Sequence, residues 1–157
     1  MGKRLVYTDA SGNCCVVHPA YSDQTRPKGE TEKALLARVA AKAIPEGIIY
    51  SVILETSVPI DRTFRNAWEA DSKGHPKVSI EKARIIHMDH IRLVRDAELS
   101  KLDVPFMRAV ESGDAAEQTR LARLKQTLRD IPQTFDLGVF STPETLKDAW
   151  PAELPTQ

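Results

Sequence analysis

Apolar and polar residues alternate in two short stretches near the start of the chain, which is the pattern of β-strands. The stretches are residues 4–8 and 14–18, and the sequence DASGN at 9–13 between them has the residue types that favour a tight turn. A third apolar run, IIYSVIL at 48–54, is rich in β-branched residues and too short to form a helix of its own. The pattern predicts a hairpin that pairs with a third strand.

A helical period lies between the hairpin and the third strand. Thr31 has the side chain of an N-cap, and Glu32 follows in the first turn, where an acidic group interacts favourably with the helix dipole. The sequence IPEG at 44–47 ends the periodic segment. Residues 1–55 are therefore predicted to form a small ββαβ lobe, in which one helix covers a three-stranded sheet. The apolar residues at helical spacing are Leu35, Leu36, Val39, Ala40 and Ala43.

Residues 56–78 have no sustained period and are predicted to connect two lobes. Pro59 and the sequence SKGHP at 72–76 interrupt regular structure. The stretch FRNAWE at 64–69 fits either a short strand or a turn. The boundary between the two predicted domains therefore falls in this connector.

The second half of the chain has the period of long amphipathic helices. Ser79 is a suitable N-cap, and neither proline nor glycine occurs in 80–102, a stretch that would span about 34 Å as a helix. Asp103 and Pro105 then predict the start of a second helix, because proline is accepted in the first turn. The sequence SGD at 112–114 predicts a weak point in that second helix. We expect the long helices to fold back on each other as an antiparallel hairpin.

Two further signals lie near the end of the chain. The sequence KQTLRDIPQTF at 125–135 indicates a helix that ends at Pro132. The segment 142–149 begins with an N-cap, a proline and an acidic residue, which predicts a short helix. The prolines beyond it predict an extended tail, and we expect Trp150 to hold this tail against the hairpin. Residues 79–157 thus form the second predicted domain, and the predicted fold class is α+β.

Composition narrows the classes of function. Hydrophobic residues make up 41% of the chain and charged residues 28%, and 22 basic residues balance 22 acidic ones. Domains that bind nucleic acid usually have a basic excess or stripe, so nucleic acid is not an expected partner. No apolar run is long enough to span a membrane, and the first residues lack the apolar core of a signal peptide. We therefore expect a protein that is made and folded in a reducing cytoplasm.

Cys14 and Cys15 are the two cysteines of the chain and are adjacent. Neighbouring residues of a strand point to opposite faces, so we do not expect the two thiols to bond to each other. The CxxC spacing of metal and redox sites is absent. The simpler interpretation is one buried and one exposed thiol, and the alternative is a disulfide between chains of an assembly.

The sequence lacks the spacings that commonly carry chemistry. His87 and His90 are neighbours on the predicted long helix, but no third metal ligand is evident near them. The GxSxG, GxGxxG and P-loop motifs are absent, and acidic residues such as Asp61 and Asp103 lie in different connectors. The sequence therefore predicts no catalytic residue, no metal ligand and no cofactor, and it favours a non-enzymatic protein.

Two Arg-Asp dipeptides occur in the helical half, Arg95-Asp96 and Arg129-Asp130. If the hairpin turns near Asp103, the two dipeptides lie ~25 Å apart along the paired helices. They meet only if the chain instead folds back at Gly113. We therefore expect each dipeptide to stabilise its own neighbourhood.

Three pieces of the second half, taken in order, resemble one known family. They are IRLVRDAELSKLD at 91–103, KQTLRDIP at 125–132 and WP at 150–151. This order resembles the phage tail assembly chaperone and tail-fibre-associated family, which carries an RxxRD helix, a later (R/K)QxLRDIP segment and a closing WP. The resemblance covers about residues 79–151, half of the chain. The sequence DRTFRNAWE at 61–69 also resembles a connector of prophage proteins that carry such a region.

The chain departs from the family pattern in two places. The family has a tryptophan soon after the aspartate that ends the RxxRD helix, whereas Val104, Pro105 and Phe106 stand there in this chain. The stretch between Pro132 and Trp150 is also longer than in the family and has its own predicted helix.

The resemblance implies a phage or prophage protein that takes part in tail or tail-fibre construction, with no catalytic residues. A structural subunit would stay in the virion, in the tail, after assembly in the bacterial cytoplasm, and its partners would be other tail or fibre proteins or copies of itself. A tail or fibre assembly chaperone would leave before the particle is complete. A small cytoplasmic adaptor module unrelated to virions is the alternative from another class.

Under each of these interpretations the function lies in protein–protein interfaces. Large aromatic residues and arginines contribute most to such interfaces, and Tyr50 is one aromatic candidate. The Arg-Asp dipeptides add charged candidates. The predicted interface residues are Phe64, Trp68, Arg92, Arg95, Asp96, Phe106, Arg129, Asp130 and Trp150.

Overall fold

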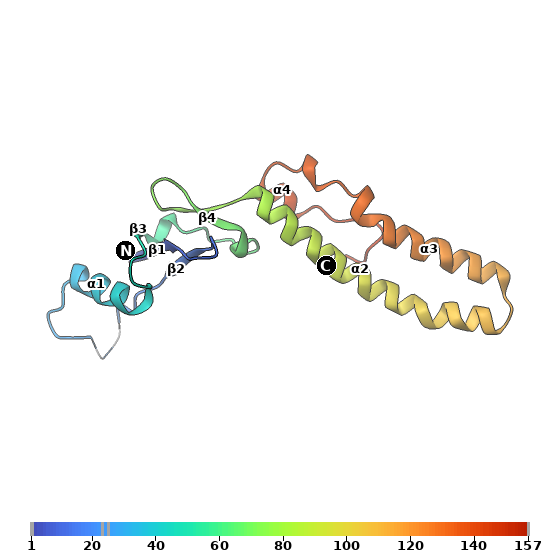
Figure 1. The fold of residues 1–157 in the computed structure, drawn as a ribbon, viewed down its shortest axis with the longest axis horizontal. Helices are drawn as coiled ribbons and strands as arrows, with labels where there is room; N and C mark the ends of the chain where they lie inside the picture. The colour runs from blue at the N-terminus through green and yellow to red at the C-terminus, as the bar shows by residue number, and fades with distance from the viewer. Residues whose placement is uncertain (1, 23, 25, 157) are drawn as a thin grey trace. The chain divides into compact units, whose positions relative to one another are not determined.

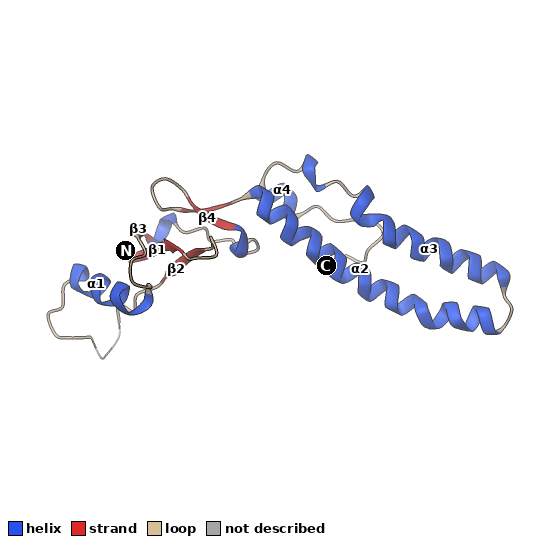
Figure 2. Cartoon of the chain, in the orientation of Figure 1, coloured by secondary structure: helices blue, strands red, loops and turns tan. Residues whose placement is uncertain are grey.

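The computed structural model describes residues 2–22, 24 and 26–156, which fold into two compact units (Figure 1). One unit is Met1–Lys82 and the other is Ala83–Gln157. The described strands lie in the first unit, and helices make up the second (Figure 2). The predicted α+β fold is therefore confirmed, with strands and one helix followed by a long helical hairpin and a short helix.

The first unit contains a three-stranded antiparallel sheet. Strands β1 (Lys3–Thr8), β2 (Cys14–Val17) and β3 (Tyr50–Leu54) lie in the order β2-β1-β3. In the register, Leu5 of β1 is opposite Val17 of β2 and Val52 of β3. The predicted hairpin and the predicted third strand are thus confirmed, and β1 is the central strand.

The turn between β1 and β2 forms through the side chain of Asp9. Its Oδ1 atom accepts hydrogen bonds of 2.9 Å from the backbone N–H groups of Ser11 and Asn13. The N–H of Gly12 donates to the Asp9 carbonyl over 3.0 Å, and Gly12 has a φ of 81°. Asp and Gly are needed at these positions because one supplies the acceptor and the other accepts a positive φ at low cost.

Helix α1 (Glu32–Ala43) covers one face of the sheet. The predicted N-cap is confirmed, since the Thr31 hydroxyl accepts a hydrogen bond of 3.2 Å from the N–H of Ala34. Leu36, Ala40 and Ile44 from the helix side pack on Leu5 of β1 and form one core cluster.

The segment predicted as a connector, residues 56–78, contains secondary structure and completes the first unit. After the 3-10 turns Glu55–Ser57 and Arg65–Ala67, strands β4 (Trp68–Ala70) and β5 (Pro76–Val78) form a second hairpin. Trp68 packs with Val6, Ile53 and Val58 on the sheet face that α1 leaves open. The unit boundary therefore lies at residue 82, after this segment, because the sheet needs its apolar residues to cover a second face.

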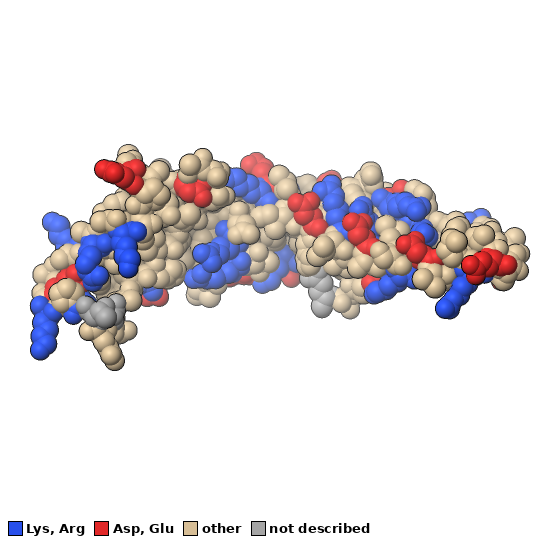
Figure 3. All heavy atoms as spheres, turned by 60° about the horizontal axis from the view of Figure 1, so that its bottom comes forward, with Lys and Arg blue, Asp and Glu red and all other residues tan. Residues whose placement is uncertain are grey.

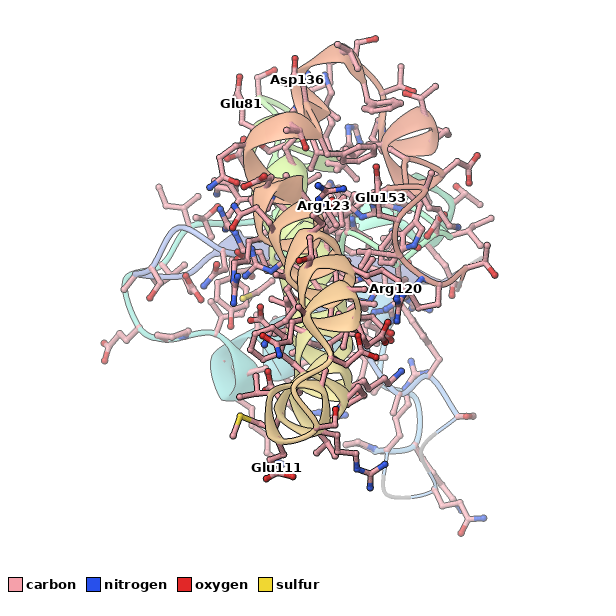
Figure 4. All side chains as sticks on the ribbon, turned by 90° about the vertical axis from the view of Figure 1, so that its right-hand side faces the viewer. Glu81, Glu111, Arg120, Arg123, Asp136 and Glu153 are labelled. Carbon is pink, nitrogen blue, oxygen red and sulfur yellow. The ribbon has the colours of Figure 1, made fainter. Side chains whose placement is uncertain are left out.

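Helices α2 (Ile80–Glu111) and α3 (Ala115–Thr134) form the antiparallel hairpin of the second half. The chain reverses at Gly113, which has a φ of 70°, and Asp114 caps α3 by accepting a hydrogen bond of 2.9 Å from the N–H of Glu117. Figure 4 views the hairpin from this end, with Glu111 in the foreground. Buried residues on the two helices include Ala83, His87, Ile91 and Ala109 on α2 and Leu121, Leu128 and Ile131 on α3.

The prediction that a new helix starts near Asp103 and Pro105 is wrong. Helix α2 continues through Pro105 to Glu111, although proline has no N–H to donate to the preceding turn. Contacts across the hairpin support the helix on both sides of this proline. Lys125 forms an ion pair of 2.6 Å with Asp103, and its ammonium lies 5.2 Å from the centre of the Phe106 ring. These contacts depend on α3 and cannot be read from the local sequence.

The predicted end of α3 is displaced by a short distance. Pro132 lies inside the helix, which continues to Thr134, and the N–H of Phe135 donates to the carbonyl of Ile131 over 2.8 Å. The 3-10 turn Leu137–Val139 and helix α4 (Pro143–Lys147) follow, with Thr142 as the predicted N-cap of α4. The short C-terminal helix is confirmed, and it is two residues shorter at its end than predicted.

Candidate functional site

The structure places two of the predicted interface residues in a core. The exposed fraction is 1% for Trp68 and 5% for Phe64. The prediction took both as interface candidates because large aromatic residues contribute most to interfaces. Trp68 is buried because its segment folds onto the open face of the sheet, and neither ring is a surface anchor.

Trp150 holds the C-terminal tail against α2, as the sequence predicted. Its ring lies edge-on to His87 at a centroid distance of 6.1 Å and tilted against His90 at 5.5 Å. Its Nε1 atom donates to the Pro155 carbonyl over 3.0 Å, which closes the tail on itself. The half-buried indole thus has a structural role inside the second unit.

The two Arg-Asp dipeptides come much closer together than the sequence predicted. The turn at Gly113 and the Asp103–Lys125 ion pair set the register of the hairpin, and extending this register places Arg95 opposite Gln133, within about one helical turn of Arg129-Asp130. The expected separation was wrong because it assumed a turn near Asp103.

The charged groups of Arg95, Asp96 and Asp130 have local partners. Arg95 binds its neighbour Asp96 at 2.7 Å, and Gln126 donates to Asp130 over 2.7 Å. Arg92 pairs with Asp89 at 2.8 Å. Acidic and basic side chains alternate along the hairpin in the same way (Figure 3). Each dipeptide therefore stabilises its own neighbourhood, as expected.

Helix α2 carries apolar side chains on the side that α3 and the tail leave uncovered. Five of them, which we call the α2 stripe, are between 45% and 70% exposed. At about 100° per residue they fall within about 120° of the helix circumference. Helices that are apolar on opposite sides are normally covered on both. The α2 stripe consists of Ile85, Leu93, Val104, Met107 and Val110.

The α2 stripe was not predicted, although its signal is present in the sequence. The amphipathic period of 80–102 predicts one apolar side, whereas Ile85 and Leu93 lie on the side away from the buried residues. Assigning residues to two separate sides of the helix would have shown a second apolar surface. The missing information was where α3 packs.

A second exposed apolar surface lies on the edge strand β3. Tyr50, Val52 and Leu54 alternate on one face of β3, and each is at least 40% exposed. They lie on the same face as Leu5, which α1 covers, but α1 does not extend over β3. Tyr50 is thus the predicted aromatic candidate that the structure places at the surface of the first unit.

A groove of about 560 Å³ lies where α3 ends beside α2. Arg84 of α2 crosses its end and donates to the carbonyls of Gly138 and Phe140 over 3.1 and 2.9 Å. Met88, Phe135 and Ile85, the stripe residue nearest the end of α3, are among its apolar lining residues. Because Arg84 is used to hold the loop 137–140, we assign the groove no ligand.

The histidines and cysteines have structural surroundings. His87 is buried with its Nε2 atom 2.6 Å from the Ala149 carbonyl, and His90 is exposed on one side of Trp150. Within the described ranges, no group of three or more His, Cys, Asp or Glu side chains is placed to hold a metal ion. Cys14 packs beside the Trp68 cluster, where burial raises the pKa of its thiol, and the Cys15 thiol lies 3.9 Å from Asp9. The two thiols are free and lie on opposite faces of β2.

Comparisons with other proteins find no relative of this chain. No helix in the described part of the chain has both the length and the apolar composition to cross a bilayer. The chain matches no model of a known protein family, and comparison with curated proteins and with solved structures finds no match either.

Proposed function

We propose that this chain is a non-enzymatic component of a tailed bacteriophage particle, associated with the tail or its fibres, and that it acts by binding other proteins. The observation that carries the proposal is the α2 stripe. Five large apolar side chains on one side of a long helix are a surface that a partner would bury. The phage assignment rests on the ordered RxxRD, LRDIP and WP sequences.

The hairpin gives the resembling sequences physical roles that suit a rigid docking element. The RxxRD and LRDIP pieces lie on paired helices, and the WP piece closes the tail on His87 of α2. All three pieces therefore stabilise the same unit. Four residues of the α2 stripe lie outside these pieces, and Leu93 stands at an unspecified position of RxxRD, so the stripe is free to vary with the partner.

Burying the α2 stripe would contribute substantially to binding. A large apolar side chain that passes from water into an interface contributes about 1.5–3 kcal/mol when it is fully buried. The stripe residues start from partial exposure and binding has its own entropic cost, so several of them must act together. Copies of the same chain and other tail or fibre proteins are both suitable partners, because either can offer an apolar face.

Two alternatives use the same surface. An assembly chaperone would cover its partner's apolar face and leave before the particle is complete. A cytoplasmic adaptor would bind one partner outside any particle. The free thiols at Cys14 and Cys15 allow a disulfide between chains in the structural role, which neither alternative requires.

The test is quantitative mass spectrometry of purified particles from a phage that carries the gene. We expect peptides of this chain in a fixed copy number per particle. Detection in infected cells but not in particles would favour the chaperone and contradict a structural role. Detection in neither fraction, or a gene without neighbouring tail genes, would favour the adaptor.

A pair of variants connects the α2 stripe to this result. Replacing Leu93→Asn together with Met107→Gln should lower the copy number in particles, because the stripe loses apolar area. The matched control is Val139→Asn, which changes an exposed apolar residue outside the stripe. Equal incorporation of all three proteins would show that the stripe is not the docking surface.

A further inference from the structure

The first unit has an open strand edge beside a pocket. β2 pairs with β1 along one edge, and no other described strand pairs with its second edge. A pocket of about 550 Å³ is lined by all four residues of Cys14–Val17. Successive residues of a strand point to opposite faces, so a pocket that touches four in a row lies along the edge of the strand. Its outward backbone N–H and C=O groups are available for pairing.

Trp68, which packs against Cys14 and Val16 of β2, has an indole N–H without a partner among the described residues. Trp68 lines the pocket, and its Nε1 atom is buried without a hydrogen-bond acceptor among the described residues. A buried donor without an acceptor costs about 1–3 kcal/mol, so the indole N–H is a sensitive reporter of changes around this pocket. Asn66 and Asn13 line the same pocket and add amide groups.

Arginines surround the end of β2. The pKa of His18, which follows β2, is below its ordinary value because its ring loses hydration and because Arg4, Arg62 and Arg65 are close to it. Arg4 is paired with Glu55. Arg65 lines the pocket itself, and Arg62 lies 5.9 Å from the centre of the Trp68 ring. Two guanidinium groups are thus placed beside the open edge.

Lys and Arg side chains form several separate groups on the visible part of the first unit, with acidic side chains among them (Figure 3). A net charge of zero for the whole chain is therefore compatible with a local basic pair such as Arg62 and Arg65.

We propose that the outer edge of β2 binds an extended acidic segment of a partner protein, which joins the sheet as a fourth strand and sets its carboxylates against Arg62 and Arg65. The strand edge supplies the backbone hydrogen bonds, as in other cases of strand addition. The arginines supply the preference for acidic side chains, and a strand at this edge would change the surroundings of the Trp68 indole, which lines the pocket. This site is separate from the α2 stripe, and it does not depend on the phage assignment.

The test is an NMR titration of the full chain with a peptide of about ten residues in which Glu alternates with Thr and Val. We expect shifts at the amides of Cys14–Val17 and at the Trp68 indole N–H, while the Trp150 indole N–H stays in place. The control peptide has Gln at every Glu position and should bind more weakly. Equal binding of the two peptides, or shifts that avoid β2, would overturn the proposal.

Variants then test the arginines. Arg62→Gln with Arg65→Gln should weaken binding of the Glu peptide about tenfold, which is the combined loss of two solvent-accessible charge pairs. Lys33→Gln with Lys42→Gln removes the same charge from exposed positions on α1 and should leave affinity unchanged. Equal weakening by both pairs, tighter binding of a single-stranded oligonucleotide of the same charge, or no binding of either peptide would each contradict an acidic strand as the ligand.

Discussion

The Nε2 atom of His87 on α2 lies 2.6 Å from the carbonyl oxygen of Ala149, 62 residues further along the chain. A carbonyl accepts, so the imidazole donates its Nε2 proton here. Both groups are buried, as are Pro151 and Leu154 beyond them. This bond joins the long helix to the tail, and the Trp150 ring covers it.

Replacing His87→Ala should release the tail from α2. The variant removes the donor for the buried Ala149 carbonyl and opens a space under Trp150, so we expect a loss of about 2–4 kcal/mol in local stability. Limited proteolysis should show new cleavage after Phe140, and hydrogen exchange should rise in 149–154. The control is Asp89→Ala, an exposed residue between the two histidines. An unchanged digestion pattern in the His87 variant would mean that the tail is held by other contacts.

The two tryptophans should report on different units. Trp68→Ala removes the largest side chain of the first unit's core and should cost about 3–5 kcal/mol there. The remaining Trp150 fluorescence should still report a cooperative transition of the second unit. Trp150→Ala should destabilise the second unit, which would increase cleavage after Phe140. The unfolding transition of the first unit, followed by Trp68 fluorescence, should stay unchanged. Urea unfolding followed by fluorescence distinguishes the cases, and a common shift in both transitions would show that the units unfold together.

The elements with local signals were predicted well from the sequence. The β1–β2 turn depends on Asp9 and Gly12, and the start of α1 depends on the Thr31 hydroxyl, so neighbouring residues contain the information. The caps of α3 and α4 are local for the same reason.

The burial of Phe64 and Trp68 and the register of the hairpin could not be predicted locally. Trp68 is buried because α1 covers one face of the sheet and leaves the other face open, and this division is a property of the whole unit. The hairpin turns at Gly113 because α2 continues through Pro105, where Lys125 of α3 contacts Asp103 and Phe106 on either side of the proline. The sequence prediction relied on the helix-breaking tendency of proline and therefore placed the turn near Asp103. The predicted distance between the Arg-Asp dipeptides was wrong for the same reason.

Replacing Pro105→Ala should stabilise the hairpin. The change restores a backbone N–H in the interior of α2 and removes a ring that clashes with the preceding turn, an effect of up to about 3 kcal/mol. Pro105→Gly should gain less, because glycine is about 1 kcal/mol worse than alanine in a helix. Thermal unfolding of the three proteins gives the order Ala, Gly, Pro. A loss of stability in the alanine variant would show that the proline conformation is needed where Phe106 meets Lys125.

Acid should weaken both hairpin turns of the first unit. Asp71 repeats the role of Asp9, since its Oδ1 accepts from the N–H groups of Lys73 and His75 over 2.8 Å. The pKa of Asp71 lies below its ordinary value, mainly because of the His75 N–H, and that of Asp9 is lowered mainly by the Asn13 side chain.

A carboxyl group whose pKa is depressed by folding stabilises the protein above its unfolded pKa of about 3.9 and loses this contribution as the pH falls through the folded value. NMR titration of the two carboxyl carbons should give midpoints below that of an unfolded peptide. Asp71→Asn should remove part of the acid dependence of the first unit's stability, while Asp148→Asn, at an exposed position of the second unit, should not. Midpoints at the unfolded value would contradict the role of these turns.

Gly74 and Gly12 occupy equivalent positions in these two turns, and they separate backbone strain from crowding. Both have a positive φ, 80° and 81°, and each N–H donates to the carbonyl of its turn's aspartate. A Cβ at Gly74 would overlap the Ser51 side chain, whereas a Cβ at Gly12 would meet nothing within 4 Å. Gly12→Ala should therefore cost only the strain of about 1 kcal/mol for a non-glycine residue at positive φ.

Gly74→Ala should cost the same strain and, in addition, the displacement of the β4–β5 turn from β3, for a total of about 2–4 kcal/mol. Ser51→Gly removes the atoms that the added methyl group at position 74 would meet, so in the double variant the substitution at 74 should cost no more than the one at 12. Urea unfolding of the four variants gives this coupling directly. Gly74→Ala could instead cost no more stability than Gly12→Ala while Ser51 is present. That result would show that the β4–β5 turn does not pack on β3 through Gly74 and Ser51.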